Sequence, residues 1–444
     1  MSPNLAISTP TQLSASPNDN MNASTDILAL ALDIVNHAAN IKTLLGSQNL
    51  PAPDFLPNSP ELPDTPEYVA LRSKLVASLD DLRLLVVGPR TTMRGLMGSS
   101  NDLAALQVAF EFGFFTIVPV AEEEGIAVEE IARQAGIDVG RTRQVLRFLC
   151  THRIFREVKE GWFAHTACSV AFGRDENLIG LGQYSMDDMF KSASSTADCI
   201  KASPQVSDLV HSPFTTRLGE TMFDYYEKNP EYAARFAKAM AGVTTIDRKP
   251  NTLGDIFPWD TLKGTVVDVG GGSGHVSMAL ARRFPHLSFR VQDSEKMLDE
   301  GRRVLSKEDQ ALASRIEMQQ HDFFQPQQPV NAVAAFFLRH VFHNWADADS
   351  IAILRALVPG LEASPAGTPM LISDRVLPCL GDGTPLHEER AMRRQDIMML
   401  VGLGAKERTR AEWEDLFQAA DERLELKNVH GQGQSALLEV VLRK

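Results

Sequence analysis

Glycines at alternate positions after an apolar segment carry the clearest chemical signal in the sequence. Residues 266–269 have the character of a buried strand, with Asp268 as the one charged residue, and Gly270, Gly272 and Gly274 follow in the run GGGSG. Glycine lets the backbone approach a ligand closely and turn sharply into a helix. The spacing differs from the GxGxxG of a dinucleotide site, where a helix N-terminus faces a pyrophosphate.

The charge of Asp268 narrows the choice of ligand. A carboxylate just before the glycines would repel a pyrophosphate but would attract a cationic amino group. The segment therefore favours a zwitterionic cofactor that carries a sulfonium, and a purely structural turn is the alternative.

Two more acids follow at the ends of predicted strands. Asp293 ends the strand predicted at 288–293, where an acid can accept hydrogen bonds from both hydroxyls of a ribose. Asp322 ends the next predicted strand and is expected to bind the amino group of an adenine, with Phe323 against the ring. Either acid alone could be a helix cap, but three acids at three successive strand ends indicate a nucleotide site.

The residues from about 261 onward alternate between strand-like and helical patterns, which argues for a parallel sheet in an α/β domain. Further strands are expected at 288–293, 315–322, 331–338 and 370–377, and helices at 275–284, 295–305 and 347–358. The last two strand-like runs, 423–430 and 436–444, leave no room for a helix between them. They are expected to pair antiparallel.

The first half of the chain is mainly helical. Helices are expected at 27–45, 67–85 and 103–117, with a Pro-rich linker at 51–66. Residues 126–155 show a helix, a turn at Gly136 and a second helix, and a hairpin through Gly161, Trp162 and Phe163 follows. This is a winged helix-turn-helix pattern, which either binds DNA or serves packing and dimerisation. The net charge of −13 opposes DNA and favours the second interpretation.

Composition and charge exclude several classes of protein. The chain has 444 residues, of which 44% are hydrophobic and 23% charged, as in a soluble protein with two buried cores. An acidic surface repels nucleic acid and anionic lipid, so nucleic acid is not an expected partner. No apolar run approaches the roughly 20 residues of a membrane span, so a membrane is not expected either. The four cysteines lie far apart without a CxxC pair, which predicts no metal site and favours a reducing cytoplasm.

Four motifs occur in an order that resembles a known family. They are VVDVGGGSGHVSMAL, LRHVFHNWADADS, LISDRVLP and GAKERTRAEWEDLF. The sequence is similar to plant and fungal O-methyltransferases related to caffeic acid O-methyltransferase, and above all to the fungal polyketide and alkaloid enzymes. The similarity spans roughly residues 215–444 and extends more weakly back to about residue 70.

The resemblance implies a fold, a cofactor and an assembly. Residues 211–444 would form a Rossmann-like class I methyltransferase domain that binds S-adenosyl-L-methionine. Its seven-stranded sheet would be mostly parallel with an antiparallel last strand. Residues 25–210 would form a helical, winged-helix dimerisation domain of a homodimer, in which the partner's N-terminal segment often reaches the substrate pocket. Residues 1–24 contain almost no large apolar residue and are expected to be disordered.

The resemblance also implies roles for single residues. His343 matches the catalytic base, and Glu407 matches one acid that flanks it. Asp374 stands where many members carry the second acid, usually a glutamate that is one methylene longer. Alternatively, Asp374 and Glu407 could be salt-bridge partners of Arg375 and Arg408. Arg339 stands where many members have a lysine near the cofactor. Neighbouring His340 is interpreted as a structural histidine.

The implied reaction is methylation of a hydroxyl on a small aromatic or polyketide-like metabolite. A pocket for this acceptor could be lined by methionines and aromatic residues, although helical core packing would explain them equally well. These are Met392, Met398, Met399, Phe223, Tyr225, Tyr226 and Phe236. Two alternatives stay open. The enzyme could bind S-adenosylmethionine yet catalyse a pericyclic or dehydrative step, or the winged helix could make the chain a DNA-binding regulator.

Overall fold

The computed structural model describes residues 26–120, 124–247, 252–431 and 436–444. The chain forms two compact units. The first holds the described part of Met1–Ala52 together with Leu62–Leu96 and Cys379–Glu388, and the second holds Pro53–Glu61, Met97–Pro378 and Glu389–Lys444. Residues 1–24, predicted to be disordered, lie outside the described residues.

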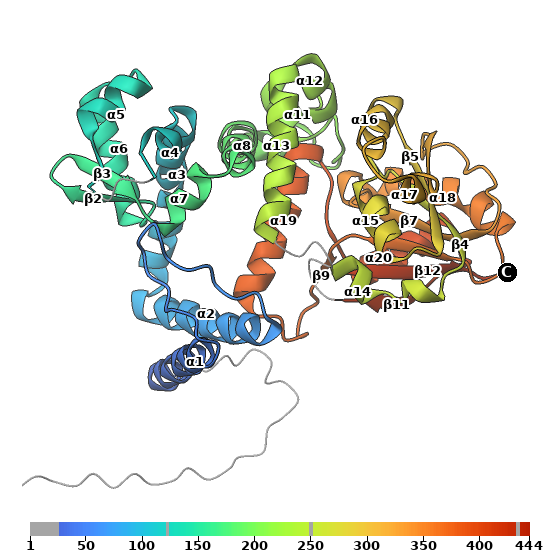
Figure 1. Cartoon of the computed structure of the whole chain (residues 1–444), viewed down its shortest axis with the longest axis horizontal. Helices are drawn as coiled ribbons and strands as arrows, with labels where there is room; N and C mark the ends of the chain where they lie inside the picture. The colour runs from blue at the N-terminus through green and yellow to red at the C-terminus, as the bar shows by residue number, and fades with distance from the viewer. Residues whose placement is uncertain (1–25, 121–123, 248–251, 432–435) are drawn as a thin grey trace, which may run out of the picture. The chain divides into compact units, whose positions relative to one another are not determined.

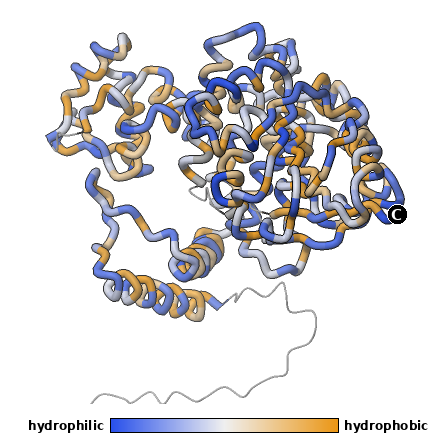
Figure 2. The backbone as a smooth tube through the Cα atoms, turned by 45° about the vertical axis from the view of Figure 1, so that its right-hand side comes forward, coloured by the Kyte–Doolittle hydropathy of each residue, from blue (hydrophilic) through white to orange (hydrophobic). Residues whose placement is uncertain are grey.

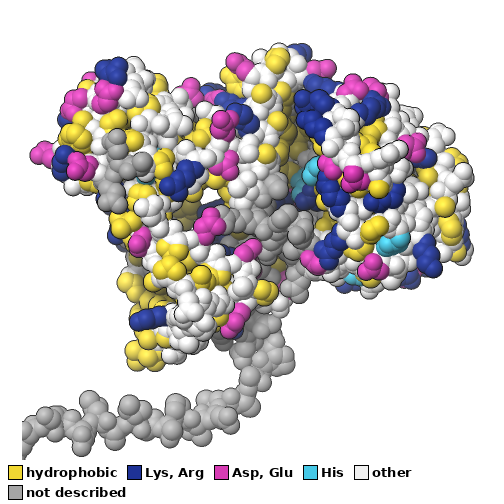
Figure 3. Space-filling view, viewed as in Figure 1, with side chains coloured by type: hydrophobic (Ala, Val, Ile, Leu, Met, Phe, Trp, Pro, Cys, Tyr) yellow, Lys and Arg dark blue, Asp and Glu magenta, His cyan; other side chains and the backbone are white. Residues whose placement is uncertain are grey.

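Two long helices make up most of the first unit. They are α1 (Ile27–Ser47) and α2 (Pro66–Val87), both expected from the sequence. The side chain of Asp26 caps α1 by accepting from the N–H groups of Leu28 and Ala29, and Thr65 caps α2. Their shared core is small, and hydrophobic side chains gather on the surface of this unit (Figure 3). Hydrophobic residues recur along both helices (Figure 2).

Helix α1 corrects one expectation from the sequence. By length and hydropathy it could cross a membrane, and 11% of its most apolar 18-residue window is buried. The expectation that no apolar segment approaches this length was therefore wrong. Core helices of soluble proteins and signal sequences have the same composition, so α1 is not assigned to a membrane.

The winged helix predicted after residue 126 is present in the second unit. Helices α5 (Val128–Ala135) and α6 (Val139–Thr151) are joined by Gly136, whose φ of 69° is left-handed. The wing is a small antiparallel sheet in the order β1-β3-β2, formed by Ile126–Ala127, Trp162–His165 and Phe155–Lys159.

The apolar stretch before the winged helix differs from its prediction. A single helix was expected at 103–117, but the chain forms α3 (Pro89–Glu111) and α4 (Phe114–Ile117). Gly113, with φ of 68°, breaks the helix between them. The break lets Phe114 and Phe115 pack into the winged-helix core, where both are fully buried.

A series of mostly short helices connects the winged helix to the α/β part (Figure 1). They are α7 (Ala167–Gly173), α8 (Glu176–Tyr184), the π-helical turn η2 (Ser185–Met189), α9 (Phe190–Ala193), α10 (Thr196–Ala202), α11 (Pro213–Leu218), α12 (Met222–Lys228), α13 (Pro230–Asp247), α14 (Thr252–Ile256) and the 3₁₀ turn η3 (Trp259–Thr261).

Among the described residues, seven strands form one sheet in the order β11-β12-β8-β7-β4-β5-β6. The strands are β4 (Gly264–Val269), β5 (Leu287–Asp293), β6 (Ile316–Gln320), β7 (Val333–Arg339), β8 (Pro369–Ser373), β11 (Leu424–His430) and β12 (Leu437–Leu442). Neighbours from β6 to β8 are parallel, while β12 runs antiparallel to both β8 and β11. The predicted mostly parallel sheet and the antiparallel final pair are confirmed.

Helices cover both faces of this sheet. One core joins the sheet to α18 (Asp347–Ala363) and α20 (Arg410–Ala420), and the other joins it to α15 (His275–Arg283), α16 (Glu295–Leu305) and α17 (Gln310–Ala313). Strands β4, β5 and β6 follow one another toward one edge of the sheet, and β7 pairs on the opposite side of β4. Ligands of such sheets bind at this switch point, outside the carboxyl ends of the strands.

A second, two-stranded sheet lies just beyond the end of β8. The run predicted as one strand at 370–377 divides into β8 and β9 (Val376–Leu377), and β9 pairs in parallel with β10 (Arg408–Thr409). Helix α19 (Leu386–Leu403) lies between them in the sequence. This pairing brings residue 407 beside the end of β8.

Candidate active site

The glycine loop after β4 is shaped by left-handed backbone conformations. Gly270, Gly272 and Gly274 have φ of 72°, 60° and 77°, which side chains other than glycine rarely adopt. A Cβ at Gly271 would lie 2.6 Å from the carboxyl carbon of Asp268. The loop therefore packs its own backbone against that acid.

Asp268 is a buried acid beneath the loop. Its Oδ2 accepts a hydrogen bond from Ser277 on α15 at 2.5 Å. Burial raises the pKa of Asp268 to about 6, whereas Ser277 and the charge of Arg339 oppose the rise. A carboxylate with so few partners can accept more hydrogen bonds from a cationic ligand group.

Asp293 is tied to the same loop. Its Oδ2 accepts the N–H of Gly272 at 2.9 Å, and its Oδ1 accepts the N–H of Ser294 at 2.7 Å. Each carboxylate oxygen has two lone pairs, so Oδ2 can still accept a hydroxyl. The acid predicted to hold a ribose thus also fixes the glycine loop.

Asp322 and Phe323 follow β6, which ends earlier than predicted, at Gln320. Asp322 is exposed and accepts the N–H of Phe324 at 3.0 Å. Phe323 borders the loop, because a Cβ at Gly270 would lie 3.6 Å from its ring. All three predicted acids are therefore at the carboxyl edge of the sheet.

Arg339 ends β7 beside the glycine strand. Burial lowers the pKa of Arg339, while the charges of Asp268 and Asp374 oppose that change. The charge of Arg339 therefore acts both on Asp268, in the predicted cofactor site, and on Asp374, in the predicted catalytic group.

His343 lies in a 3₁₀ turn, η4 (Phe342–Asn344), just beyond β7. Its Nδ1 is 3.1 Å from Oε1 of Glu407. A carboxylate only accepts hydrogen bonds, so Nδ1 carries the hydrogen and the neutral ring keeps Nε2 free of one. Burial lowers the pKa of His343, but Asp374 and Glu407 outweigh this effect and raise the pKa above its usual value.

Asp374 lies beneath the turn that carries His343. Its Oδ2 accepts the N–H of Phe342 at 3.1 Å, and burial raises its pKa to about 6. Its Oδ1 is 4.0 Å from Nδ1 of His343 and has no hydrogen-bond partner among the described residues. The structure thus brings the three predicted catalytic residues together but gives His343 one direct acid partner.

From the sequence, Arg408 was considered only as a possible salt-bridge partner of Asp374 or Glu407. It is buried, and it donates to the carbonyl oxygens of Phe342 at 3.1 Å and Trp345 at 3.0 Å. It also binds Asp347 at 2.8 Å. Arg408 thus holds the backbone on both sides of His343, a role that its position next to Glu407 in the sequence could not show.

The methionines and aromatic residues proposed for an acceptor pocket mostly pack against one another. Tyr226 and Met399 are buried in one cluster, and Tyr226 stacks on Phe236 with ring centroids 5.0 Å apart. In contrast, Phe223 is 44% exposed. Core packing therefore accounts for these two buried side chains.

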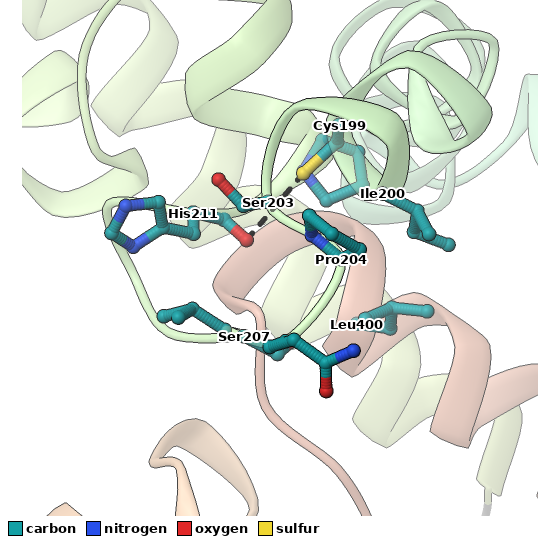
Figure 4. A pocket seen from close by; sticks show the side chains of 10 residues that line it. Cys199, Ile200, Ser203, Pro204, Ser207, His211 and Leu400 are labelled. Atoms are coloured by element: carbon teal, nitrogen blue, oxygen red, sulfur yellow. Dashed lines mark hydrogen bonds between the residues drawn. The ribbon is translucent and has the colours of Figure 1, made fainter.

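Figure 4 shows a cavity of about 360 Å³ whose lining contains none of the predicted site residues. It is lined by Cys199, Ile200, Ser203, Pro204, Gln205, Val206, Ser207, His211, Pro213 and Leu400. Across the described part of the chain, no group of three or more His, Cys, Asp or Glu residues is placed to hold a metal ion.

Two family models match the chain. The O-methyltransferase domain matches residues 198–421, and the O-methyltransferase dimerisation domain matches residues 95–175. The chain is 53% identical to O-methyltransferase sol2 of Alternaria solani over 418 residues, which cover 94% of this chain and 95% of the relative. It is 30% identical to chlorophenol O-methyltransferase of Trichoderma longibrachiatum, over 92% of this chain and 88% of that enzyme.

Solved structures share the fold. OxaC superposes with a TM-score of 0.74 at 24% identity, covering 94% of this chain and 99% of OxaC. LepI, determined in complex with S-adenosylmethionine, superposes with a TM-score of 0.69 at 21% identity, over 92% of this chain and all of LepI.

Proposed function

The chain belongs to the O-methyltransferase family and uses S-adenosylmethionine, and we propose that it methylates a hydroxyl of a small aromatic secondary metabolite with His343 as general base. The observation that carries this proposal is the hydrogen bond between His343 and Glu407. It leaves Nε2 of the neutral imidazole without a hydrogen, and this is the atom that can take a proton from an acceptor hydroxyl.

The residues around the glycine loop fit the cofactor. Asp268 would bind the amino group, and Asp293 would bind the ribose hydroxyls through the lone pairs that Gly272 and Ser294 leave free. Asp322 would bind the adenine amino group and Phe323 would lie against the ring. When bound, the cofactor supplies a methyl group on a sulfonium.

The surroundings of His343 define its task. A phenol with a pKa near 10 and a histidine near 6.5 differ by roughly 3.5 units, or about 5 kcal/mol. Full ionisation of the acceptor before transfer is unfavourable, so His343 takes the proton as the new bond forms. The raised pKa of His343 reduces the mismatch, and Glu407 stabilises the imidazolium.

An aromatic acceptor is supported by the relatives. One of them is named for chlorophenol, and another is named as the O-methyltransferase of a grayanic acid biosynthesis cluster in Cladonia grayi. We also propose a homodimer held by the helices between residues 67 and 155, since the dimerisation model covers 95–175.

The alternative is a pericyclic or dehydrative reaction on the same scaffold. One similar structure is titled a pericyclic reaction enzyme, but at 20% identity it supports the fold alone. The His343–Glu407 pair favours methylation over a pericyclic reaction, because a pericyclic step requires no group that removes a hydroxyl proton.

One experiment separates the two functions. The protein is incubated with S-adenosylmethionine labelled in its methyl group and a panel of phenolic polyketides, and the products are analysed by mass. A product that gains one labelled methyl group, with S-adenosylhomocysteine formed in equal amount, supports methylation. A product of unchanged mass from the natural substrate, without S-adenosylhomocysteine, overturns it.

A further inference from the structure

One carboxylate oxygen in the active site has two nitrogen partners, from a histidine and an arginine. Oε1 of Glu407 lies 3.1 Å from Nδ1 of His343 and also 3.1 Å from Nη1 of Arg375. The side chains are nearly buried, with 1% of Glu407 and 11% each of His343 and Arg375 exposed. Water therefore screens these charges little.

We propose that Arg375 is a positioning residue that controls how strongly His343 holds its proton, because both share Oε1 of Glu407. This inference rests on the proposed function of His343 as the base. It assigns Arg375 a task that is distinct from substrate or cofactor binding.

The charges around His343 explain why such a residue is needed. Two buried carboxylates face the imidazole, Glu407 at 3.1 Å and Asp374 at 4.0 Å. Without another cation they would hold His343 as an imidazolium, which cannot accept a proton. The charge of Arg375 compensates Glu407, the acid that bonds His343, whereas the charges of Arg339 and Arg408 act on Asp374.

The remaining neighbours do not replace Arg375. His340 stacks on His343 with ring centroids 5.3 Å apart. Burial, together with Arg339, His343, Arg375 and His275, keeps the pKa of His340 well below its usual value, so its ring is neutral. Arg375 also opposes the rise in the pKa of His343 and lowers the pKa of Glu407, in agreement with its position.

The geometry permits two opposite effects of removing Arg375, and they can be told apart. If Arg375 acts by charge, its loss strengthens the attraction between His343 and the carboxylates, and the pKa of His343 rises. If Arg375 only holds Glu407 in place, its loss frees Glu407 to rotate away, and the pKa of His343 falls.

The test is a titration of the full-length protein. The protein is prepared with labelled histidine, and the ring signal of His343 is followed by NMR as the pH changes. The signal is assigned by its loss in His343→Asn. The pH profile of kcat/KM is measured in parallel. Arg375→Gln is expected to raise the titration midpoint by roughly 1–3 pH units, the effect of an opposite or like charge at this range. Arg375→Lys, which keeps the charge, should shift it much less.

Arg410→Gln is the matched control, because Arg410 forms an exposed ion pair with Glu414. It should leave the midpoint unchanged. If Arg375→Gln does not fold, as judged by its melting temperature, Arg375→Met removes the same charge with an apolar chain that suits burial. An unchanged or lowered midpoint in the neutral variant overturns the proposal, as does an equal shift in Arg375→Lys.

Failure of this inference is distinct from failure of the proposed function. If His343→Ala keeps full methyl transfer, His343 is not the base, although the NMR shift in Arg375→Gln would persist. If His343→Ala is inactive and Arg375→Gln titrates normally, only the inference about Arg375 fails.

Discussion

The carboxylate of Asp374 ends 4.0 Å from Nδ1 of His343, which is too far for a hydrogen bond, and Glu407 takes that place at 3.1 Å. Asp374 instead accepts the N–H of Phe342 and fixes the turn that carries His343. The two acids therefore differ in function, although the family pattern treats them as a pair.

Because the two acids have different partners, substituting Glu407 should lower kcat more than substituting Asp374. Glu407→Gln should reduce kcat by roughly 10²-fold or more, because a neutral amide neither fixes the tautomer nor stabilises the imidazolium. Asp374→Asn keeps an oxygen for Phe342 and should cost less than about tenfold. Steady-state kinetics of both variants decide the point, and equal losses would show that Asp374 also contacts His343 during catalysis.

His343→Ala should reduce methyl transfer by roughly 10²–10⁴, the usual range for losing a general base. Cofactor affinity should be nearly unchanged, because His343 makes none of the contacts assigned to the cofactor. His286→Ala, which removes an exposed histidine outside the predicted site, is the matched control. Calorimetry measures the affinity, and product mass measures the transfer. A variant that retains normal transfer would falsify the assignment of the base.

Asp293→Ala should weaken S-adenosylmethionine binding by about 1.5–3 kcal/mol, since the ribose loses a charged acceptor. Part of the loss would come from the glycine loop, because Asp293 also accepts the N–H of Gly272. Asp299→Ala, an exposed acid on α16 paired with Arg302, serves as the control. If calorimetry finds equal affinities for both folded variants, Asp293 does not belong to the site.

Cofactor affinity should depend on pH through Asp268. Its raised pKa of about 6 means that the carboxylate is protonated below that value and cannot pair with a cationic amino group. Affinity should therefore be constant above pH 7 and fall about tenfold per unit below pH 6. Asp268→Asn should bind weakly at every pH, whereas Asp374→Asn should keep the dependence. Calorimetry between pH 5 and 8 measures this affinity. An affinity that does not change with pH would show that Asp268 does not bind the cofactor.

The proposed homodimer should be sensitive to the apolar surface of α2, which lies within the proposed interface. Leu85 and Val86 are 43% and 65% exposed, as expected for side chains that a second subunit covers. Leu85→Asp combined with Val86→Asp should convert the dimer to monomer at micromolar concentration. Sedimentation measures this, with Asn36→Asp as the control for added charge. A wild-type protein that sediments as a monomer would exclude the dimer itself.

Local patterns in the sequence were enough to predict the α/β sheet, the winged helix and the glycine loop. Alternation of strands and helices, together with the positions of Gly270, Gly272 and Gly274, depends on neighbours in the chain. Such short-range preferences can be read without knowing what packs where. The single helix predicted at 103–117 failed because tertiary packing of Phe114 and Phe115 favours a break at Gly113.

The catalytic arrangement depends on contacts between residues far apart in the chain. Family motifs named His343, Asp374 and Glu407, but periodicity could not show that one acid bonds the base while the other holds its backbone. The pairing of β9 with β10 sets these distances, and it joins segments that α19 separates. From the sequence, Arg375 and Arg408 could be considered only as salt-bridge partners of Asp374 and Glu407. Their separate positions depend on contacts between distant segments: Arg375 binds Glu407, and the buried Arg408 holds the backbone around His343.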